Sequence, residues 1–197
     1  MIAAMTQYTQ NKEDLTQQKA KKFNLWLGMI GMFMMFAALS SGFIVYTEGG
    51  VGKGIKTLLP NAFIYSTILI VLSSVTMQLA YVAAKKTSFG KQQSLLIVTI
   101  LLGLAFFVMQ VHAWGILTSR GVVFVNSNAS QSFIYVFTGM HLAHIVAGIL
   151  VLVRALIGRI RSIPQVNNVF RMDLATIFWH FLGFLWIYIY VFLLLNQ

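Results

Sequence analysis

Ser94-Leu-Leu-Ile-Val-Thr-Ile-Leu-Leu-Gly-Leu-Ala-Phe-Phe-Val-Met-Gln-Val-His-Ala-Trp-Gly-Ile-Leu117 runs for 24 residues without a charged side chain. A helix needs about 20 such residues to cross the hydrocarbon core of a membrane. Four further uncharged runs of similar length occupy residues 23–46, 61–84, 131–153 and 174–195. Because only helices and closed barrels satisfy their backbone groups in lipid, the sequence predicts an all-α bundle of five transmembrane helices, preceded by a polar N-terminal arm at residues 1–22.

The basic residues between these runs fall mostly on one side of the predicted membrane. Four precede the first run, three follow the second and four follow the fourth, whereas the opposite side holds only Lys53, Lys56 and Arg120. Loops rich in lysine and arginine stay on the cytoplasmic side. We therefore expect the N-terminal arm in the cytoplasm and the C-terminus outside.

The overall composition excludes several classes of function. Hydrophobic residues make up 58% of the 197 residues and charged residues 9%, with a mean hydropathy of +0.80, so no separate catalytic domain is expected. The net charge of +10 is explained by cytoplasmic loops that face anionic lipid, and no nucleic-acid partner is expected. The chain has no cysteine, which excludes disulfides, iron–sulfur clusters and thiolate copper or zinc sites.

Polar side chains inside the apolar runs are costly in lipid and are the first candidates for function. The runs hold no carboxylate or basic side chain in their central parts. The candidates are Gln110, His112, His141, His144 and His180, with the serine pairs Ser40-Ser41 and Ser73-Ser74. Carriers that couple to protons or ions commonly use buried carboxylates or lysines. Only imidazoles are available for such work here.

The histidines allow two interpretations. His141-x-x-His144 has a spacing at which two ligands share one side of a helix, and imidazole binds haem, copper and zinc. Alternatively, each histidine donates a hydrogen bond to a neighbouring helix, which by itself justifies its burial. We favour the second interpretation, because the pair has no carboxylate or thiolate nearby.

Helical periodicity assigns several small and polar residues to common faces. Gly139, Ala143 and Ala147 form a seam of small residues on the fourth run, a pattern that allows close approach of another helix. Gln110 and Trp114 share a face of the third run. We expect these residues to act in helix packing.

The depth of two histidines can be estimated from the ends of their runs. His144 precedes residue 153 by nine residues, and His180 follows residue 174 by six. With a rise of about 1.5 Å per residue, both lie roughly a third of the way in from the cytoplasmic side. We expect them to meet if the fourth and fifth helices are neighbours.

Several of these segments resemble subunit III of the haem–copper respiratory oxidases. Phe137-Thr-Gly-Met-His-Leu-Ala-His-Ile-Val-Ala-Gly148 is similar to the aromatic–Thr–Gly–x–His–x–x–His–Val–x–x–Gly helix of that family. Gln110 and Trp114 precede it in the family's order, and Phe178-Trp-His-Phe181 resembles the closing Tyr-Trp-His-Phe segment. Trp26 and the serine-rich second run resemble the first two helices of the five-helix bacterial forms. The resemblance therefore covers all five predicted spans.

The chain departs from the family pattern at two proton-binding positions. The family often carries a buried glutamate six residues after the tryptophan of its opening helix, where this chain has Met32. After Trp-His-Phe the family usually has a valine and a carboxylate, where this chain has Leu182-Gly183. A thioether and a glycine bind no proton at neutral pH, so these positions cannot carry the proton uptake linked to the family's carboxylates.

The resemblance implies subunit III of a proton-pumping terminal oxidase, a cytochrome c oxidase of aerobic respiration in the bacterial inner membrane. Such a chain has no catalytic residue and binds neither haem nor copper, which are expected in its partners: catalytic subunit I, subunit II and other respiratory subunits. The family's third subunit stabilises subunit I and holds phospholipid in a cleft between its first two helices and the rest. The residues expected to carry the structural role are Gln110, Trp114, Gly139, His141, Ala143, His144, Ala147, Trp179 and His180, with Trp26, Arg154 and Arg171 as lipid contacts.

Other functions stay open on the sequence. The third subunit of a ubiquinol oxidase and an accessory protein of nitric oxide reductase share these motifs. A function of another class is a free-standing membrane carrier or metalloenzyme that uses His141 and His144. That alternative predicts metal or activity in the isolated chain.

Overall fold

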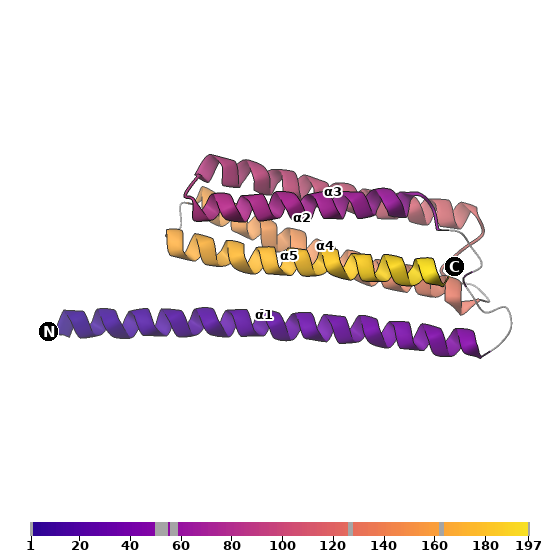
Figure 1. Cartoon of the computed structure of the whole chain (residues 1–197), viewed down its shortest axis with the longest axis horizontal. Helices are drawn as coiled ribbons and strands as arrows, with labels where there is room; N and C mark the ends of the chain where they lie inside the picture. Colours follow the sequence, from indigo (N-terminus) through magenta and orange to yellow (C-terminus); the bar gives the residue numbers. More distant parts are fainter. Residues whose placement is uncertain (1, 50–54, 56–58, 126–127, 162–163, 197) are drawn as a thin grey trace.

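The described part of the chain folds into five α-helices (Figure 1). The computed structural model describes residues 2–49, 55, 59–125, 128–161 and 164–196, with side chains from residue 15 onward. The helices are α1 (Ile2–Glu48), α2 (Ala62–Lys85), α3 (Phe89–Ser119), α4 (Ala129–Ile160) and α5 (Gln165–Leu195). All five are long and apolar enough to cross a membrane. The predicted all-α, five-span bundle is confirmed.

The helices extend beyond the predicted spans at the end where the chain begins. α1 begins at Ile2, so most of the polar arm at residues 1–22 continues the first helix. α4 continues to Ile160, and Pro164 already caps α5. Most of the stretch between the fourth and fifth uncharged runs, residues 154–173, therefore belongs to these two helices. Arg154 and Arg159 end the apolar pattern of the fourth run but lie within α4. Arg171 precedes the fifth run and lies within α5.

Helices α2–α5 form a four-helix core, and α1 lies along one side of it. α2 packs along α3 and α5, α4 packs along α3 and α5, and α1 contacts only α4 and α5 among the described residues. α2 and α3 form an antiparallel hairpin through a turn in which Thr87 has a φ of 55°. The resemblance implied that the first two helices stand apart from the rest. Here α2 belongs to the core, and α1 alone is attached from outside.

α1 contacts the core along one narrow seam. Met29, Phe36 and Phe43 are buried at intervals of seven residues, the spacing that keeps one side of a helix against its neighbours. The Phe36 ring lies 6.4 Å from that of Phe137, and Phe43 meets Phe133 edge-on at 5.6 Å. Much of the rest of α1 is an exposed apolar surface, as a helix bordering lipid requires.

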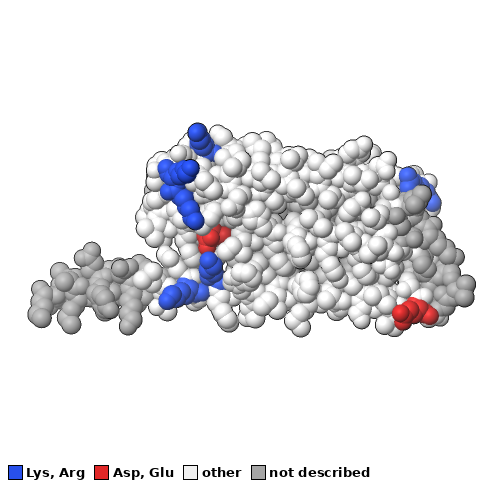
Figure 2. Space-filling view, viewed as in Figure 1, with Lys and Arg blue, Asp and Glu red and all other residues white. Residues whose placement is uncertain are grey.

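Charge is distributed unevenly along the bundle axis. Figure 2 shows most lysine and arginine side chains gathered at the end where α1 enters the bundle, with a broad uncharged band beyond them. An uncharged band of this kind is what the hydrocarbon region demands. The distribution supports the predicted orientation, in which the basic end faces the cytoplasm.

The predicted orientation is testable with reporter fusions. Alkaline phosphatase, which is active only outside the cytoplasm, should be active when fused at the C-terminus and inactive when inserted in the turn at residues 86–88. A green fluorescent protein should give the opposite pattern. An active phosphatase in the turn together with an inactive one at the C-terminus would reverse the orientation.

Candidate functional site: contacts between the helices and cavities at their ends

Trp179 of α5 lies at the centre of the four-helix core. Its Nε1 donates to Ser73 Oγ of α2 at 3.0 Å. A Cβ added to Gly103 of α3 would lie 2.8 Å from Cη2 of the indole, and one added to Gly148 of α4 would lie 3.1 Å from Cζ3. One side chain therefore touches the other three helices of the core. The two glycines provide the room for its ring.

Further polar pairs join neighbouring helices inside the core. Each places an indole N–H or an amide on an oxygen of another helix, which offsets the cost of burying polar groups in an apolar interior. The pairs are Trp186 Nε1 to Thr67 Oγ1 at 2.9 Å, Trp114 Nε1 to Thr138 Oγ1 at 3.0 Å, Gln110 Nε2 to Ser66 Oγ at 2.7 Å and Gln92 Nε2 to Asn168 Oδ1 at 3.0 Å. Gln110 and Trp114 thus bind different helices, α2 and α4.

His141 of α4 is fully buried between aromatic rings. Its ring centroid lies 5.2 Å from that of Trp186 and 5.8 Å from that of Phe106. Neither ring nitrogen has a hydrogen-bond partner among the residues that the structure describes. The expectation that each histidine donates to a neighbouring helix is therefore wrong for His141, which packs as an aromatic ring.

His144 and His180 do not meet, although α4 and α5 are neighbours. His144 Nδ1 lies 2.7 Å from the Met140 carbonyl of its own helix, and its ring faces Phe36 of α1. His180 Nε2 lies 3.1 Å from Gln78 Oε1 of α2. Of these two histidines only His180 forms the expected bond between helices. The estimate of depth concerned only the height of each residue along its helix, whereas a contact depends also on the side of the helix that the residue occupies.

The rings of His141 and His144 do not converge on one site. His141 lies against α3 and α5, whereas His144 lies against α1, so the two rings turn to different neighbours. In the described ranges no three His, Asp or Glu side chains are grouped closely enough to hold a metal ion.

The seam of small residues on α4 makes no close helix contact with the described part of the chain. Ala143 and Ala147 are exposed, and a Cβ added to Gly139 would make an ordinary 3.8 Å contact with Trp114. The close approaches occur at Gly103 and Gly148 instead. A row of small residues on one side of a helix is compatible with a close helix contact. The row alone does not predict which glycine packs against a large aromatic ring.

An ion pair ties α1 to the core at the basic end. Lys22 Nζ lies 2.9 Å from Asp173 Oδ2, and Tyr81 of α2 donates to Asp173 Oδ1 at 2.9 Å. The carboxylate thus connects α1, α2 and α5. The sequence offered a signal for this contact, because Asp173 is the sole acidic residue after Glu48.

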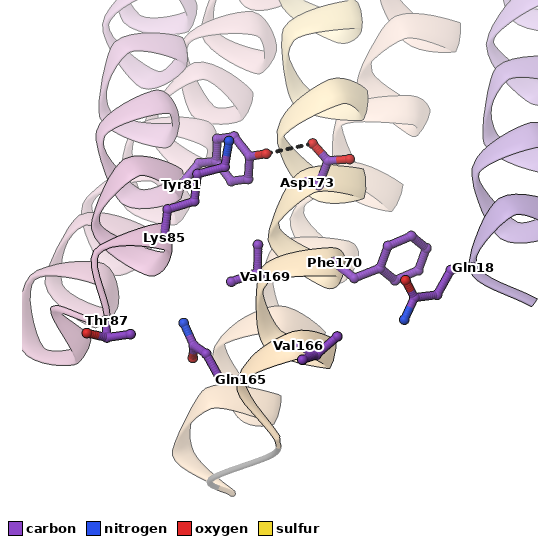
Figure 3. A pocket seen from close by; sticks show the side chains of 9 residues that line it. All are labelled: Gln18, Tyr81, Lys85, Thr87, Gln165, Val166, Val169, Phe170 and Asp173. Carbon is purple, nitrogen blue, oxygen red and sulfur yellow. Dashed lines mark hydrogen bonds between the residues drawn. The ribbon is translucent and has the colours of Figure 1, made fainter. Parts of the chain in front are cut away.

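Two cavities open at the same end of the bundle. One of about 520 Å³ lies between α1, α2 and α5, and Figure 3 shows Gln18 and Phe170 on one side of it and Lys85 and Thr87 on the other. The second, of about 300 Å³, is lined by Arg154 of α4 and Arg171 of α5. The predicted lipid contacts Arg154 and Arg171 are therefore brought together. The third, Trp26, is exposed on α1.

These contacts define a multi-pass helical membrane protein whose inner polar groups connect helices to one another. Residues 8–196 match the family described as cytochrome c oxidase subunit III, and the chain belongs to this family. It is thus a third subunit of the haem–copper oxidases, located in the bacterial inner membrane. The predictions of the family, of the place of the chain as third subunit of a haem–copper oxidase, and of its location are confirmed.

The relatives of the chain include subunits of two kinds of oxidase. It is 27% identical over 181 residues to cytochrome c oxidase subunit 3 of Bacillus subtilis, covering 90% of this chain and 87% of the relative. It is 34% identical over 174 residues to cytochrome bo(3) ubiquinol oxidase subunit 3 of Pseudomonas aeruginosa, covering 85% and 81%. The homologous protein of Buchnera aphidicola from Acyrthosiphon pisum, also of the ubiquinol oxidase, is 28% identical over 191 residues, covering 93% and 90%.

Replacing Gly148 by alanine should destabilise the bundle by about 1–3 kcal/mol, the usual cost of overpacking. The new methyl group would lie 2.8 Å from Leu182 Cδ1 and 3.1 Å from the rigid Trp179 ring. Gly115→Ala is the matched control, since nothing lies within 4 Å of its added Cβ. Unfolding in mixed detergent, followed by tryptophan fluorescence, measures both variants. Equal stabilities of the two variants would contradict the packing described for Trp179.

Proposed function

We propose that this chain is a structural subunit of a cytochrome c oxidase and carries no redox group of its own. It stabilises catalytic subunit I, and the haem and copper belong to subunit I and subunit II. The divergence of His141 and His144 supports this proposal most directly, because it leaves the chain without a pair of converging ligands. The absence of cysteine from the sequence supports it as well.

A ubiquinol oxidase is the alternative enzyme, and the 34% identity with the subunit of Pseudomonas aeruginosa favours it. In either enzyme this chain has the same structural role, because the electron donor binds to other subunits in both. The second subunit distinguishes the two: one that binds copper indicates cytochrome c as the donor. The choice therefore depends on the partner.

Purification through a tag on this chain tests the proposal. In mild detergent the tagged chain should co-purify with a haem protein, detected by its reduced-minus-oxidised spectrum, and with a second subunit that binds copper. Metal analysis of the separated subunits distinguishes the enzymes. A copper-free second subunit would favour the ubiquinol oxidase, and a preparation without haem would contradict membership of any oxidase complex.

We also propose that Arg154 and Arg171 bind the headgroup of an anionic phospholipid. They line one cavity at the end of the bundle that the positive-inside rule places at the cytoplasmic surface. Two guanidinium groups in one cavity suit a phosphate, which they can bind through paired hydrogen bonds. The apolar wall formed by Val151 and Leu174 suits the first part of an acyl chain.

Substitution of the two arginines tests the lipid proposal. A basic residue near an anionic surface contributes about 1 kcal/mol, so Arg154→Gln and Arg171→Gln should each weaken retention of anionic lipid roughly fivefold. Native mass spectrometry of the purified complex counts the retained lipid. Lys86→Gln, an exposed change at the same end, is the control. Equal lipid retention in all three variants would contradict a site at the arginines.

A further inference from the structure

A cavity lies at the end of the bundle opposite the basic end, where α2 begins and α3 ends. These two helix ends are adjacent because α2 and α3 pack along each other in an antiparallel hairpin (Figure 1). This α2–α3 cavity has a volume of about 400 Å³, and its lining includes Asn61, Tyr65, Met109, His112, Ile116 and Arg120. It is not the cleft that the family resemblance implied, because only α1 stands outside the core of this bundle.

The α2–α3 cavity runs from the membrane surface into the hydrocarbon. Arg120 lies three residues beyond the predicted boundary at residue 117, and Met109 lies eight residues inside it. At about 1.5 Å per residue along a helix, Arg120 is about 5 Å outside the hydrocarbon and Met109 is about 12 Å inside it. His112 falls between them, about 8 Å inside. The cavity therefore has a charged end at the surface and an apolar end in the hydrocarbon.

Several hydrogen-bond donors line the cavity without an acceptor from the described part of the chain. The amide of Asn61 makes no capping bond to α2, and no described residue bonds to the Tyr65 hydroxyl or to the His112 ring. All three side chains are exposed. Arg120 adds a permanent positive charge, and no acidic residue is among the described residues that line the cavity. An occupant that accepts hydrogen bonds and carries negative charge is therefore favoured.

A phospholipid has its chemical groups in the same order along the membrane normal. Its phosphate lies at the surface, its ester carbonyls lie at the edge of the hydrocarbon, and its acyl chains fill the interior. A guanidinium binds phosphate oxygens through paired, charge-assisted hydrogen bonds. An imidazole N–H at the depth of His112 meets little water, so an ester carbonyl is the acceptor that offsets its desolvation. The cavity thus matches one phospholipid molecule in both charge and polarity.

We propose that the α2–α3 cavity binds one phospholipid of the leaflet opposite the basic end. Arg120 and Asn61 bind its phosphodiester, and His112 donates a hydrogen bond to an ester carbonyl. An acyl chain lies along Met109 and Ile116. This site differs from the one proposed at the basic end in its leaflet and in its use of a histidine. It does not depend on which oxidase the chain belongs to.

Lipid titration of the purified complex tests the site. Native mass spectrometry counts the molecules of phosphatidylglycerol that bind after detergent has stripped the complex of lipid. Arg120→Gln should weaken the binding of one molecule about tenfold, because a hydrogen bond with a charged group is lost. Arg161→Gln, which removes an exposed arginine at the other end of the bundle, should bind as the wild type does. Wild-type binding by Arg120→Gln would overturn the proposal, as would an equal loss in both variants.

Two competitors identify the part of the lipid that the cavity recognises. Inorganic phosphate carries the charge without the acyl chains, and diacylglycerol carries the ester groups and the chains without the phosphate. Neither should displace the molecule whose binding depends on Arg120. Displacement by inorganic phosphate would indicate a site for free phosphate, and displacement by diacylglycerol would indicate a site for acyl chains alone. Either result would overturn the proposal.

The role of His112 gives a second, independent test. His112→Phe keeps an aromatic ring at an exposed position but removes the N–H, so phosphatidylglycerol should bind about fivefold more weakly. His112→Gln, whose amide restores a donor, should bind the lipid more tightly than His112→Phe does. Equal affinities of His112→Phe and the wild type would overturn the placement of the lipid in this cavity.

Discussion

The contact of Trp179 with Gly103, Gly148 and Ser73 holds the core together. Helices in a membrane gain little from the hydrophobic effect when they associate, so close packing and hydrogen bonds must bring them together. The indole supplies both, since its ring fills the space above two glycines and its N–H binds a serine of a third helix. This one side chain thereby joins α5 to α2, α3 and α4, while α1 packs against α4 and α5.

The need for hydrogen bonds between helices also explains where the polar side chains of the bundle lie. Inside, amides and indoles bind hydroxyls of neighbouring helices, and His141 is enclosed by aromatic rings. The end of the bundle that carries most of the basic residues holds the Lys22–Asp173 pair and the cavity between Arg154 and Arg171. The inner polar groups of the described chain thus serve its own packing.

The sequence was sufficient for the number, order and approximate position of the helices, because uncharged runs of about 20 residues have few alternatives in lipid. It did not determine which side of each helix faces inward. The Gly139, Ala143 and Ala147 seam and the meeting of His144 with His180 failed for this reason. The seven-residue spacing of Met29, Phe36 and Phe43 was a signal for their burial that the sequence analysis did not use, whereas the match of Gly103 and Gly148 to Trp179 depends on contacts between distant segments.

The central claim is that the chain belongs to a redox enzyme without holding a redox group. The most direct test is a haem and metal assay of each subunit after the purified complex has been dissociated. Haem and copper should be recovered with the other subunits, and the fraction with this chain should contain neither in stoichiometric amount. One equivalent of haem, copper or zinc bound to this chain would contradict the account.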